Sequence, residues 1–533
     1  MMKKRLFLTG ISAAMVLALM TGCASEGIKE AGTQTAQAST TDNDDIDITA
    51  EADDSGASDD KTYAEQMENS TDGEHVINAD GTTEEYTNVS IEKTGDSEGD
   101  EADFYGENSA VFATNTATLT LSDMNIHTNG THANAVFSYG EGTTVNISDS
   151  VIETEGNCSG GIMTTGGGTM NAENLTIHTS GRSSAAIRSD RGGGTVNVTG
   201  GSYTTDGVGS PAIYSTADIT VSDADLTSTA SEGIVVEGKN SVTLNNVNLS
   251  ADNNQKNSDK SDNYKAVMIY QSMSGDAAEG KASFTMNGGT LTNENGDVFF
   301  VNNTVADISL SGASITNNGD GVFLRAEAAG WGNEGSNGGH VNMYAEGQDI
   351  NGDMVVDDIS TLNLYLSDGS VFTGQINSDG EKGNVYVQLT DGATWKLTGD
   401  SYIGSLTCDA DSIDLNGYTL YVEGKAYENG TAVSGEAYEI ESSAADSGDR
   451  QAPPDGERPE LPDDFDPSSL PKDMQAPPDF ENGERPEKPS GDMDGMTPPD
   501  LNNGERPEKP SGDMNNPPQK PSGDNTNGPE AAN

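Results

Sequence analysis

Hydrophobic and polar residues follow a pattern in the middle of this chain that recurs about every 25 residues. Each unit opens with a small residue or Asp, followed by Val, Ile or, in one copy, Met. The opening hydrophobic residues are Val111, Val136, Ile162, Ile187, Ile213, Ile234, Val267, Val298, Val322 and Met354. The first intervals between them are 25, 26, 25 and 26 residues, and later intervals range from 21 to 33. A short, nearly constant period predicts a solenoid, in which stacked copies bury the apolar faces that no single copy can bury alone.

A second segment of each unit has the period-two pattern of a β-strand. Polar and apolar residues alternate in 118–121, 144–147, 195–198 and 241–244, and a third apolar position such as Ile126 or Ile152 follows. Gly, Asn and Asp, which favour turns, separate these segments. Three short strands per unit predict a β-helix of about 10 or 11 coils.

Strand parity predicts which residues of the second strand face outward. Its apolar residues must face the core, so the residues between them form a polar ladder of Thr, Asn, Ser and Asp. The ladder contains Thr118, Thr120, Thr144, Asn146, Thr169, Asn171, Thr195, Asn197, Asp218, Thr220, Ser241, Thr243, Ser283 and Thr285. Such residues suit exposed strands and stack well between coils. A structural ladder is the first interpretation, and a surface for a sugar polymer or an ice-binding-like array are the alternatives.

The first strand predicts a second, aromatic face. If Val111 and its counterparts point inward, the residues after them point outward. The opposite parity would bury Arg188 in a narrow apolar core, which costs free energy, so we favour the outward assignment. The contact residues expected on this face are Phe112, Phe137, Arg188, Tyr214, Phe299 and Phe323. A long apolar stripe marks either an interaction surface or a face that another segment covers. As an interaction surface, it would stack aromatic rings on sugars or anchor a protein partner.

Three arginines, Arg182, Arg188 and Arg191, lie near one predicted coil. Guanidinium groups pair well with the carboxylate or sulfate of an acidic sugar, but they also balance nearby acids as solvated charges. The sequence leaves both interpretations open.

Aligning the units places His127, Glu153 and His178 at one outward position on three consecutive coils. The two histidines would be about twice the 4.8 Å coil spacing apart, which is far for one zinc ion. We therefore predict a polar ladder and no metal site. Acidic turns such as Asp357–Asp358 suit calcium, although no calcium-loop motif specifies a site. Apart from calcium, we expect no cofactor.

Composition limits the class of protein further. Only 32% of the 533 residues are hydrophobic and 5% are aromatic, which suits a thin solenoid core with disordered flanks. The net charge of −62 argues against nucleic acid or an anionic membrane surface as a partner. The 88 acidic residues bring carboxylates together by chance, so they carry almost no catalytic information.

The N-terminus has the features of an export signal. Basic residues 3–5 precede an apolar stretch from Leu6 to Met20, and Cys23 follows Thr21 and Gly22. This segment resembles a bacterial lipoprotein signal peptide, although Met20 stands where that family usually has Leu. The resemblance implies cleavage after residue 22, lipidation of Cys23, and attachment to the outer face of a bacterial membrane through that lipid alone.

These features predict four regions. Residues 1–22 form the signal peptide, and residues 23–85 form an acidic, Thr/Ser-rich disordered linker. Residues 86–440 form the β-helix domain. Residues 441–533 form a repetitive disordered tail, since 18 of the 19 prolines lie beyond Gln451.

The repeat region resembles the pectate-lyase-like superfamily of β-helices and bacterial β-helical adhesins. This resemblance implies an all-β chain with a single right-handed parallel β-helix. The Arg-rich lyase motif and the paired-Asp and His-Gly hydrolase motifs of that superfamily are not found, so no catalytic residue is assigned. The function we expect is a non-catalytic adhesin or carbohydrate-binding lipoprotein that contacts a polysaccharide, a cell-surface glycan or a protein. The alternatives are a β-helical polysaccharide lyase or hydrolase, and a structural surface protein without a small-molecule ligand.

Overall fold

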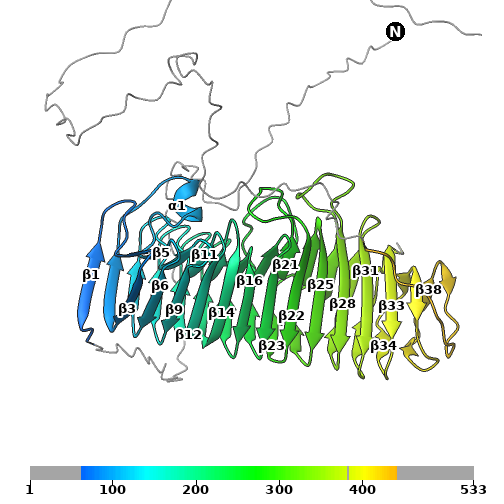
Figure 1. Ribbon diagram of the computed structural model, residues 1–533. Coiled ribbons are helices and arrows are strands. Elements are labelled where there is room, and N and C mark those ends of the chain that lie inside the picture. The colour runs from blue at the N-terminus through cyan, green and yellow to red at the C-terminus, as the bar shows by residue number, and fades with distance from the viewer. Residues whose placement is uncertain (1–61, 381–382, 441–533) are drawn as a thin grey trace, which may run out of the picture. The chain divides into compact units, whose positions relative to one another are not determined.

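The computed structural model describes residues 62–380 and 383–440, and in them the all-β parallel β-helix is confirmed. The strands stack in chain order from β1 to β38 (Figure 1). One short helix, α1 (Asp100–Phe104), interrupts the strands. In this described part of the chain, no helix is long and apolar enough to cross a membrane. Cys23 and the predicted signal peptide and tail lie outside the described residues.

One side of the coils is an 11-stranded parallel sheet, here called sheet B, to which each coil before the last ones gives one strand. Its strands are β2 (Ile77–Asp80), β5 (Val111–Thr114), β8 (Val136–Tyr139), β11 (Ile162–Thr165), β13 (Ile187–Ser189), β15 (Ile213–Ser215), β18 (Ile234–Glu237), β21 (Lys265–Tyr270), β24 (Asp297–Asn302), β27 (Val322–Ala326) and β30 (Asp353–Val356). These strands contain the opening residues of the sequence repeat.

The rest of most coils belongs to a 21-stranded parallel sheet, here called sheet A. Its strands are β1 (Glu65–Asn69), β3 (Thr83–Thr87), β4 (Val89–Lys93), β6 (Thr118–Ser122), β7 (Asn125–Thr128), β9 (Thr144–Ser148), β10 (Val151–Thr154), β12 (Gly168–Thr179), β14 (Gly194–Thr205), β16 (Asp218–Ser222), β17 (Asp225–Ser228), β19 (Ser241–Asn245), β20 (Asn248–Ala251), β22 (Lys281–Asn287), β23 (Thr290–Asn293), β25 (Thr304–Ser311), β26 (Ser314–Asn317), β28 (Gly339–Glu346), β31 (Thr361–Ser367), β33 (Asn384–Leu389) and β36 (Ser405–Thr407).

Two small sheets complete the last coils. The first contains β29 (Asp349–Asn351), β32 (Val371–Gly374), β34 (Thr394–Leu397) and β37 (Ile413–Asp414). The second contains β35 (Ser401–Ile403), β38 (Leu420–Val422) and β39 (Lys425–Ala426), and its last pair is antiparallel.

The β-helix begins earlier than the predicted boundary at residue 86. Strands β1 and β2 lie in the segment that was expected to be linker, β3 begins in it, and β2 pairs with β5 in the register Ile77 to Val111. Only Ile77 and Ala79 are buried on β2. Two apolar positions are too short a signal to distinguish a strand from an acidic linker.

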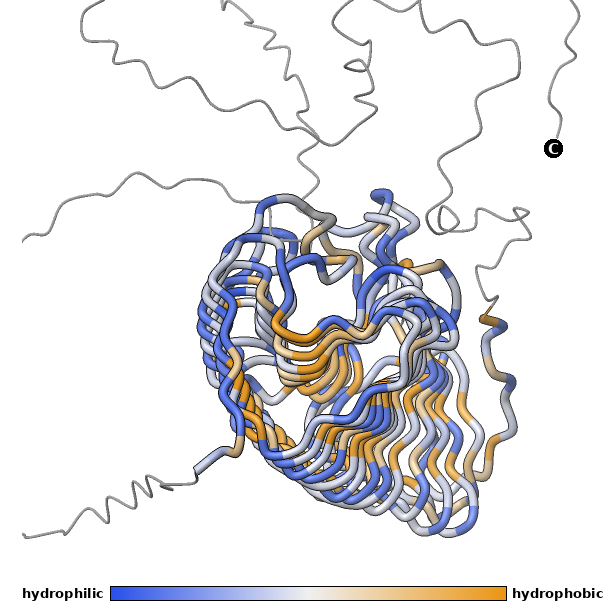
Figure 2. The backbone as a smooth tube through the Cα atoms, turned by 60° about the vertical axis from the view of Figure 1, so that its left-hand side comes forward, coloured by the Kyte–Doolittle hydropathy of each residue, from blue (hydrophilic) through white to orange (hydrophobic). Residues whose placement is uncertain are grey.

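The core lies inside the coils, where inward residues of successive strands form continuous columns. Along sheet A, Leu119, Val145, Met170 and Val196 lie in register and are buried, while the residues beside them are not. In Figure 2 hydrophobic positions align from coil to coil as continuous stripes. The hydrophobic pattern of the sequence therefore predicted the inward columns of sheet A correctly.

A column of glycines allows neighbouring coils to approach closely at one turn. A Cβ atom added to Gly130, Gly156, Gly181 or Gly207 would lie 1.8 to 2.0 Å from the carbonyl oxygen of the glycine one coil earlier. The serines three residues after Gly156, Gly181 and Gly207 donate hydrogen bonds to the same carbonyl column, as Ser159 Oγ does to Gly130 O at 2.8 Å and Ser184 Oγ to Gly156 O at 3.0 Å. This turn fixes the spacing of the first coils.

Candidate functional site

The aromatic face predicted on sheet B is covered by other segments, which is the second of the two interpretations that the sequence left open, and it is therefore not an open contact surface. Phe112 and Phe137 face away from the inside of the coil, as expected, and their strands lie in register. Phe137, however, is 0% exposed, since the segment after α1 packs on it, and Phe112 is half-buried and stacks on His75 at a ring-centroid distance of 4.6 Å.

Phe299 and Phe323 lie inside the coil, which corrects their predicted outward orientation. Both belong to the main core, and their ring centroids are 5.5 Å apart. In sheet B, Phe299 pairs with the inward Val267, and it is Phe300 that faces outward beside Met268. The register also shifts between Val322 and Leu324. Because the later intervals of the repeat are irregular, the alignment of the units took the wrong residue as the one facing inward, one position away from Phe299.

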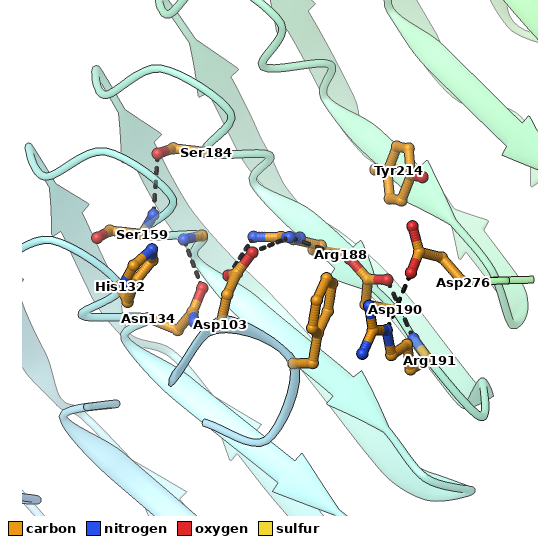
Figure 3. Close-up of polar contacts among 12 residues, drawn as sticks. Asp103, His132, Asn134, Ser159, Ser184, Arg188, Asp190, Arg191, Tyr214 and Asp276 are labelled. Atoms are coloured by element: carbon orange, nitrogen blue, oxygen red, sulfur yellow. Dashed lines mark hydrogen bonds and ion pairs between the residues drawn. The ribbon is translucent and has the colours of Figure 1, made fainter. Parts of the chain in front are cut away.

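Arg188 faces outward but is only 3% exposed, because α1 covers it. Its guanidinium donates hydrogen bonds to both carboxylate oxygens of Asp103, at 2.8 and 2.7 Å, and to Asp190 at 3.0 Å (Figure 3). Burial raises the pKa of Asp190 to about 8, against the opposing effect of Arg188. The ion pair of Arg188 with Asp103 therefore holds α1 against sheet B, and Arg188 is not available to a ligand in this conformation.

The neighbouring groups on sheet B extend the same covered layer. Arg191 stacks on the Phe104 ring at 3.7 Å and donates to Asp276 at 2.9 Å. Tyr214 donates its hydroxyl to the buried Glu237 at 2.5 Å. Further along the sheet, Trp331 packs against Tyr270. The long loops of the later units therefore cover sheet B instead of framing an open groove on it.

The other charged groups singled out in the sequence are separate from this layer. Arg182 is exposed and donates to Asn257. His127 and His178 lie in register with Glu153, as predicted, but each contacts a different acid: His127 contacts Glu92 at 2.9 Å, and His178 contacts Asp206 at 2.7 Å. Within residues 62–380 and 383–440, no group of three His, Cys, Asp or Glu side chains is arranged to hold a metal ion.

The polar ladder of sheet A faces outward, as predicted, and the structure shows what orders it. Asn171 donates to Asn146 at 2.9 Å and Asn197 donates to Asn171 at 3.0 Å, so the amides form a chain from coil to coil. One column of this ladder continues in register from Thr243 through Thr285 and Ser309 to two tyrosines.

Those tyrosines, the exposed Tyr344 on β28 and the half-buried Tyr365 on β31, form an outward-facing aromatic pair that the sequence reasoning missed. Their rings are nearly parallel, at 8°, with centroids 5.0 Å apart. Tyr365 therefore covers one face of the Tyr344 ring. The residue one coil earlier is the small Ser309, which leaves the other ring face open, and Tyr344 is 39% exposed.

A surface depression of about 240 Å³ lies at this open ring face. Its lining includes Ser309 and Ser311 from β25, Tyr344 and Glu346 from β28, and Asn287 from β22. The register explains this grouping, because Ser311 pairs with Glu346 in the same way as Ser309 pairs with Tyr344. An apolar ring face, two hydroxyls, an amide and a carboxylate thus converge on one small site.

Two further features define this face. Lys281 forms an ion pair with Asp307 on the neighbouring column. Partial burial, with Asp307 nearby, raises the pKa of the Tyr344 hydroxyl, so this tyrosine stays neutral at physiological pH. The C-terminal segment lies against strand β31 of Tyr365, where Asn363 Nδ2 donates to Tyr438 O and the backbone N–H of Tyr438 donates to Asn363 Oδ1. The open face therefore ends at the two tyrosines.

A second depression, of about 450 Å³, lies near the last coils and has no aromatic residue in its lining. Two aspartates, Asp391 and Asp409, line it together with Thr390, Thr407 and Cys408. It offers polar and acidic groups but no ring on which a sugar could stack.

Comparison with known proteins finds no matching family model and no similar curated protein. Among solved structures, a chain of the cryo-EM structure of the Vag8–C1 inhibitor complex is similar to this one, with 16% identity and a TM-score of 0.37. The match covers 68% of this chain and 100% of that chain. The assignment of the parallel β-helix rests on the strand register itself, and the likeness to the pectate-lyase-like superfamily stays a prediction.

Proposed function

We propose that this protein is a cell-surface lipoprotein whose β-helix binds carbohydrate without cleaving it, as an adhesin or a glycan-binding module. The observation that carries the proposal is the open ring face of Tyr344 above Ser309 and Ser311. A tyrosine offers an apolar face with a polar tip, and ligand sites combine such a surface with a few convergent polar groups. A pyranose, with one apolar face and a rim of hydroxyls, matches both features.

The lining of this depression also favours binding over cleavage. Hydrolysis of a glycosidic bond uses two carboxyl groups that flank the bond. Glu346 is the single carboxylate among the residues that line the Tyr344 depression. A sugar held there has a stacking surface and hydrogen-bond partners, but no second acid or base.

The proposed location rests on the sequence. The basic, apolar and Cys23 elements of residues 1–23 are those of a lipoprotein signal, and the lipid would hold the β-helix at the outer face of the membrane. A tethered module needs only a modest affinity for each site, because many copies on one surface engage a polymer together.

A lyase or hydrolase is the second candidate function, and one observation favours it. Asp391 and Asp409 both line the larger depression near the last coils, so a pair of carboxylates is present on that part of the surface. A catalytic role would require them to act on a polymer bound beside the last coils.

A glycan array together with a reducing-end release assay on the bound polymers, both with the full mature chain, separates these functions. We expect binding to at least one glycan without release of reducing ends. If the wild-type protein releases reducing ends and the Asp391→Asn and Asp409→Asn variants do not, the proposal is overturned and the protein is an enzyme. No binding to any glycan would contradict it and leave a structural surface protein.

A further inference from the structure

We propose that the Tyr344 depression is selective for glycans that carry a free, positively charged amino group, and that Glu346 is the residue that recognises this group. The ligand class is therefore a polymer containing unacetylated amino sugars. This inference rests on the proposed carbohydrate-binding function and names the chemistry of the ligand at the same site.

The position of Glu346 supports the assignment. Glu346 follows Tyr344 by two residues on β28, so both side chains project from the same face of the sheet, about 6.6 Å apart along the strand. Both line the depression, with Ser309 and Ser311 opposite them on β25. When an amino sugar stacks on the ring of Tyr344, its own amino group or that of the next sugar in the polymer thus lies within reach of the Glu346 carboxylate.

The chemistry of a carboxylate gives it this selectivity. An ionised carboxylate accepts hydrogen bonds and donates none, so an ammonium group satisfies it better than a hydroxyl or an acetamide does. Hydrogen bonds in which both partners are charged are about twice as strong as neutral ones. Ser309, Ser311 and Asn287 supply neutral partners for the remaining hydroxyls.

The charge around the depression also favours a positively charged ligand. Lys281, the lysine on the neighbouring strand β22, is engaged by Asp307 and does not neutralise Glu346. The whole chain carries a net charge of −62. Such a surface attracts polycations over long distances and repels polymers of uronic acids.

The sheet provides a matched control for Glu346. Glu173 lies in the same outward column, since the register runs from Glu173 through Thr199, Ser222, Asn245, Asn287 and Ser311 to Glu346. It is exposed, but Asn171 occupies the position that Tyr344 holds beside Glu346. A Glu173→Gln variant therefore removes one charge from the same face without touching the depression.

The test is isothermal titration of the full mature chain with three probes: oligomers of glucosamine, the fully N-acetylated oligomers of equal length, and oligogalacturonate. We expect the glucosamine oligomers to bind about tenfold tighter than the acetylated ones, the difference between a charged and a neutral hydrogen bond. Oligogalacturonate should bind weakest. In Glu346→Gln the tenfold preference should disappear because the affinity for the glucosamine oligomers falls about tenfold, and Glu173→Gln should keep the preference.

Each other outcome decides against a particular claim. If Glu346→Gln keeps the preference, or if Glu173→Gln loses it equally, general charge attraction accounts for it and the inference is overturned. If acetylated and free oligomers bind alike and Tyr344→Ala weakens both, the amine selectivity fails but the carbohydrate-binding function stands. If neither oligomer binds, the amine selectivity is overturned, and binding of any other polymer on the glycan array would still support the carbohydrate-binding function.

Discussion

Replacing Gly156 with alanine should destabilise the β-helix strongly, and the structure allows the cost to be worked out. The added Cβ would lie 1.9 Å from Gly130 O and 2.9 Å from Ser159 Oγ. Carbon and oxygen atoms meet at about 3.3 Å or more, so the two coils would have to move apart by over 1 Å. Gly156 has an ordinary backbone conformation, so the whole effect comes from this contact.

The separation weakens two hydrogen bonds that join the coils, from Ser159 Oγ to Gly130 O and from Ser184 Oγ to Gly156 O. Each contributes about 1 kcal/mol, and overpacking adds about 1–3 kcal/mol. We therefore expect a loss of about 3–5 kcal/mol. A glycine-to-alanine change at an unhindered position would instead stabilise the protein by about 0.4–1 kcal/mol.

The assay is guanidinium unfolding of the full chain, followed by the circular dichroism of the strands. Gly288→Ala is the control, since Gly288 has a φ of +65° but no atom within 4 Å of the added Cβ, so it measures the backbone penalty alone, about 1–2 kcal/mol. The close stacking of the glycine column would be refuted if Gly156→Ala unfolded at the wild-type concentration or above, or later than Gly288→Ala.

Two further predictions concern the covered face of sheet B. Arg188→Met leaves the carboxylate of Asp103 buried without its cation, so thermal unfolding should show a loss of about 3–5 kcal/mol. The same change at the exposed Arg182 should have little effect, and equal effects of the two changes would contradict the buried ion pair. Because the folded pKa of Asp190 is raised to about 8, its protonation stabilises the fold at low pH, and that contribution is lost as pH rises through 8. The melting temperature of the wild type should therefore fall more between pH 6 and pH 8 than that of Asp190→Asn. This pH range lies above the pKa of about 6 of the buried Asp297. An identical fall of the melting temperature in both proteins would contradict the raised pKa of Asp190.

The fold and the polar ladder could be predicted from the sequence because both follow from local spacing. Each coil must return to the same position after a similar number of residues, and inward strand positions must be apolar. The alternation around Leu119 and Val145 therefore identified both the core and the outward Thr and Asn residues.

Covering of sheet B was one of the two interpretations of its apolar stripe, but the segments that cover it could not be predicted, because they have no periodicity. Parity correctly placed Arg188 on the outer side of the sheet, but its counterion Asp103 lies 85 residues earlier in the chain, on a short helix without a sequence signal. For the same reason Phe137 was expected to be exposed and is buried.

Tyr344 and Tyr365 were missed although the sequence contains their signal. Both occupy outward positions in a polar–apolar alternation, in Asn342–Tyr344 and Asn363–Tyr365, which is the pattern that identified the ladder in the earlier units. Irregular intervals between the later units prevented their alignment with Thr285 and Ser309. Extending the ladder by strand register, not by fixed spacing, brings the tyrosines into the same column.

The most direct test of the carbohydrate-binding site is the affinity of Tyr344→Ala for the glycan that the wild-type protein binds best, measured by titration beside Tyr418→Ala. Tyr418 is a tyrosine of similar exposure, 43%, that is not part of the depression. A central aromatic contact contributes about 2 kcal/mol, so Tyr344→Ala should bind about thirtyfold more weakly while Tyr418→Ala binds as the wild type does. Unchanged affinity in Tyr344→Ala would place the glycan elsewhere on the protein and contradict the proposed site.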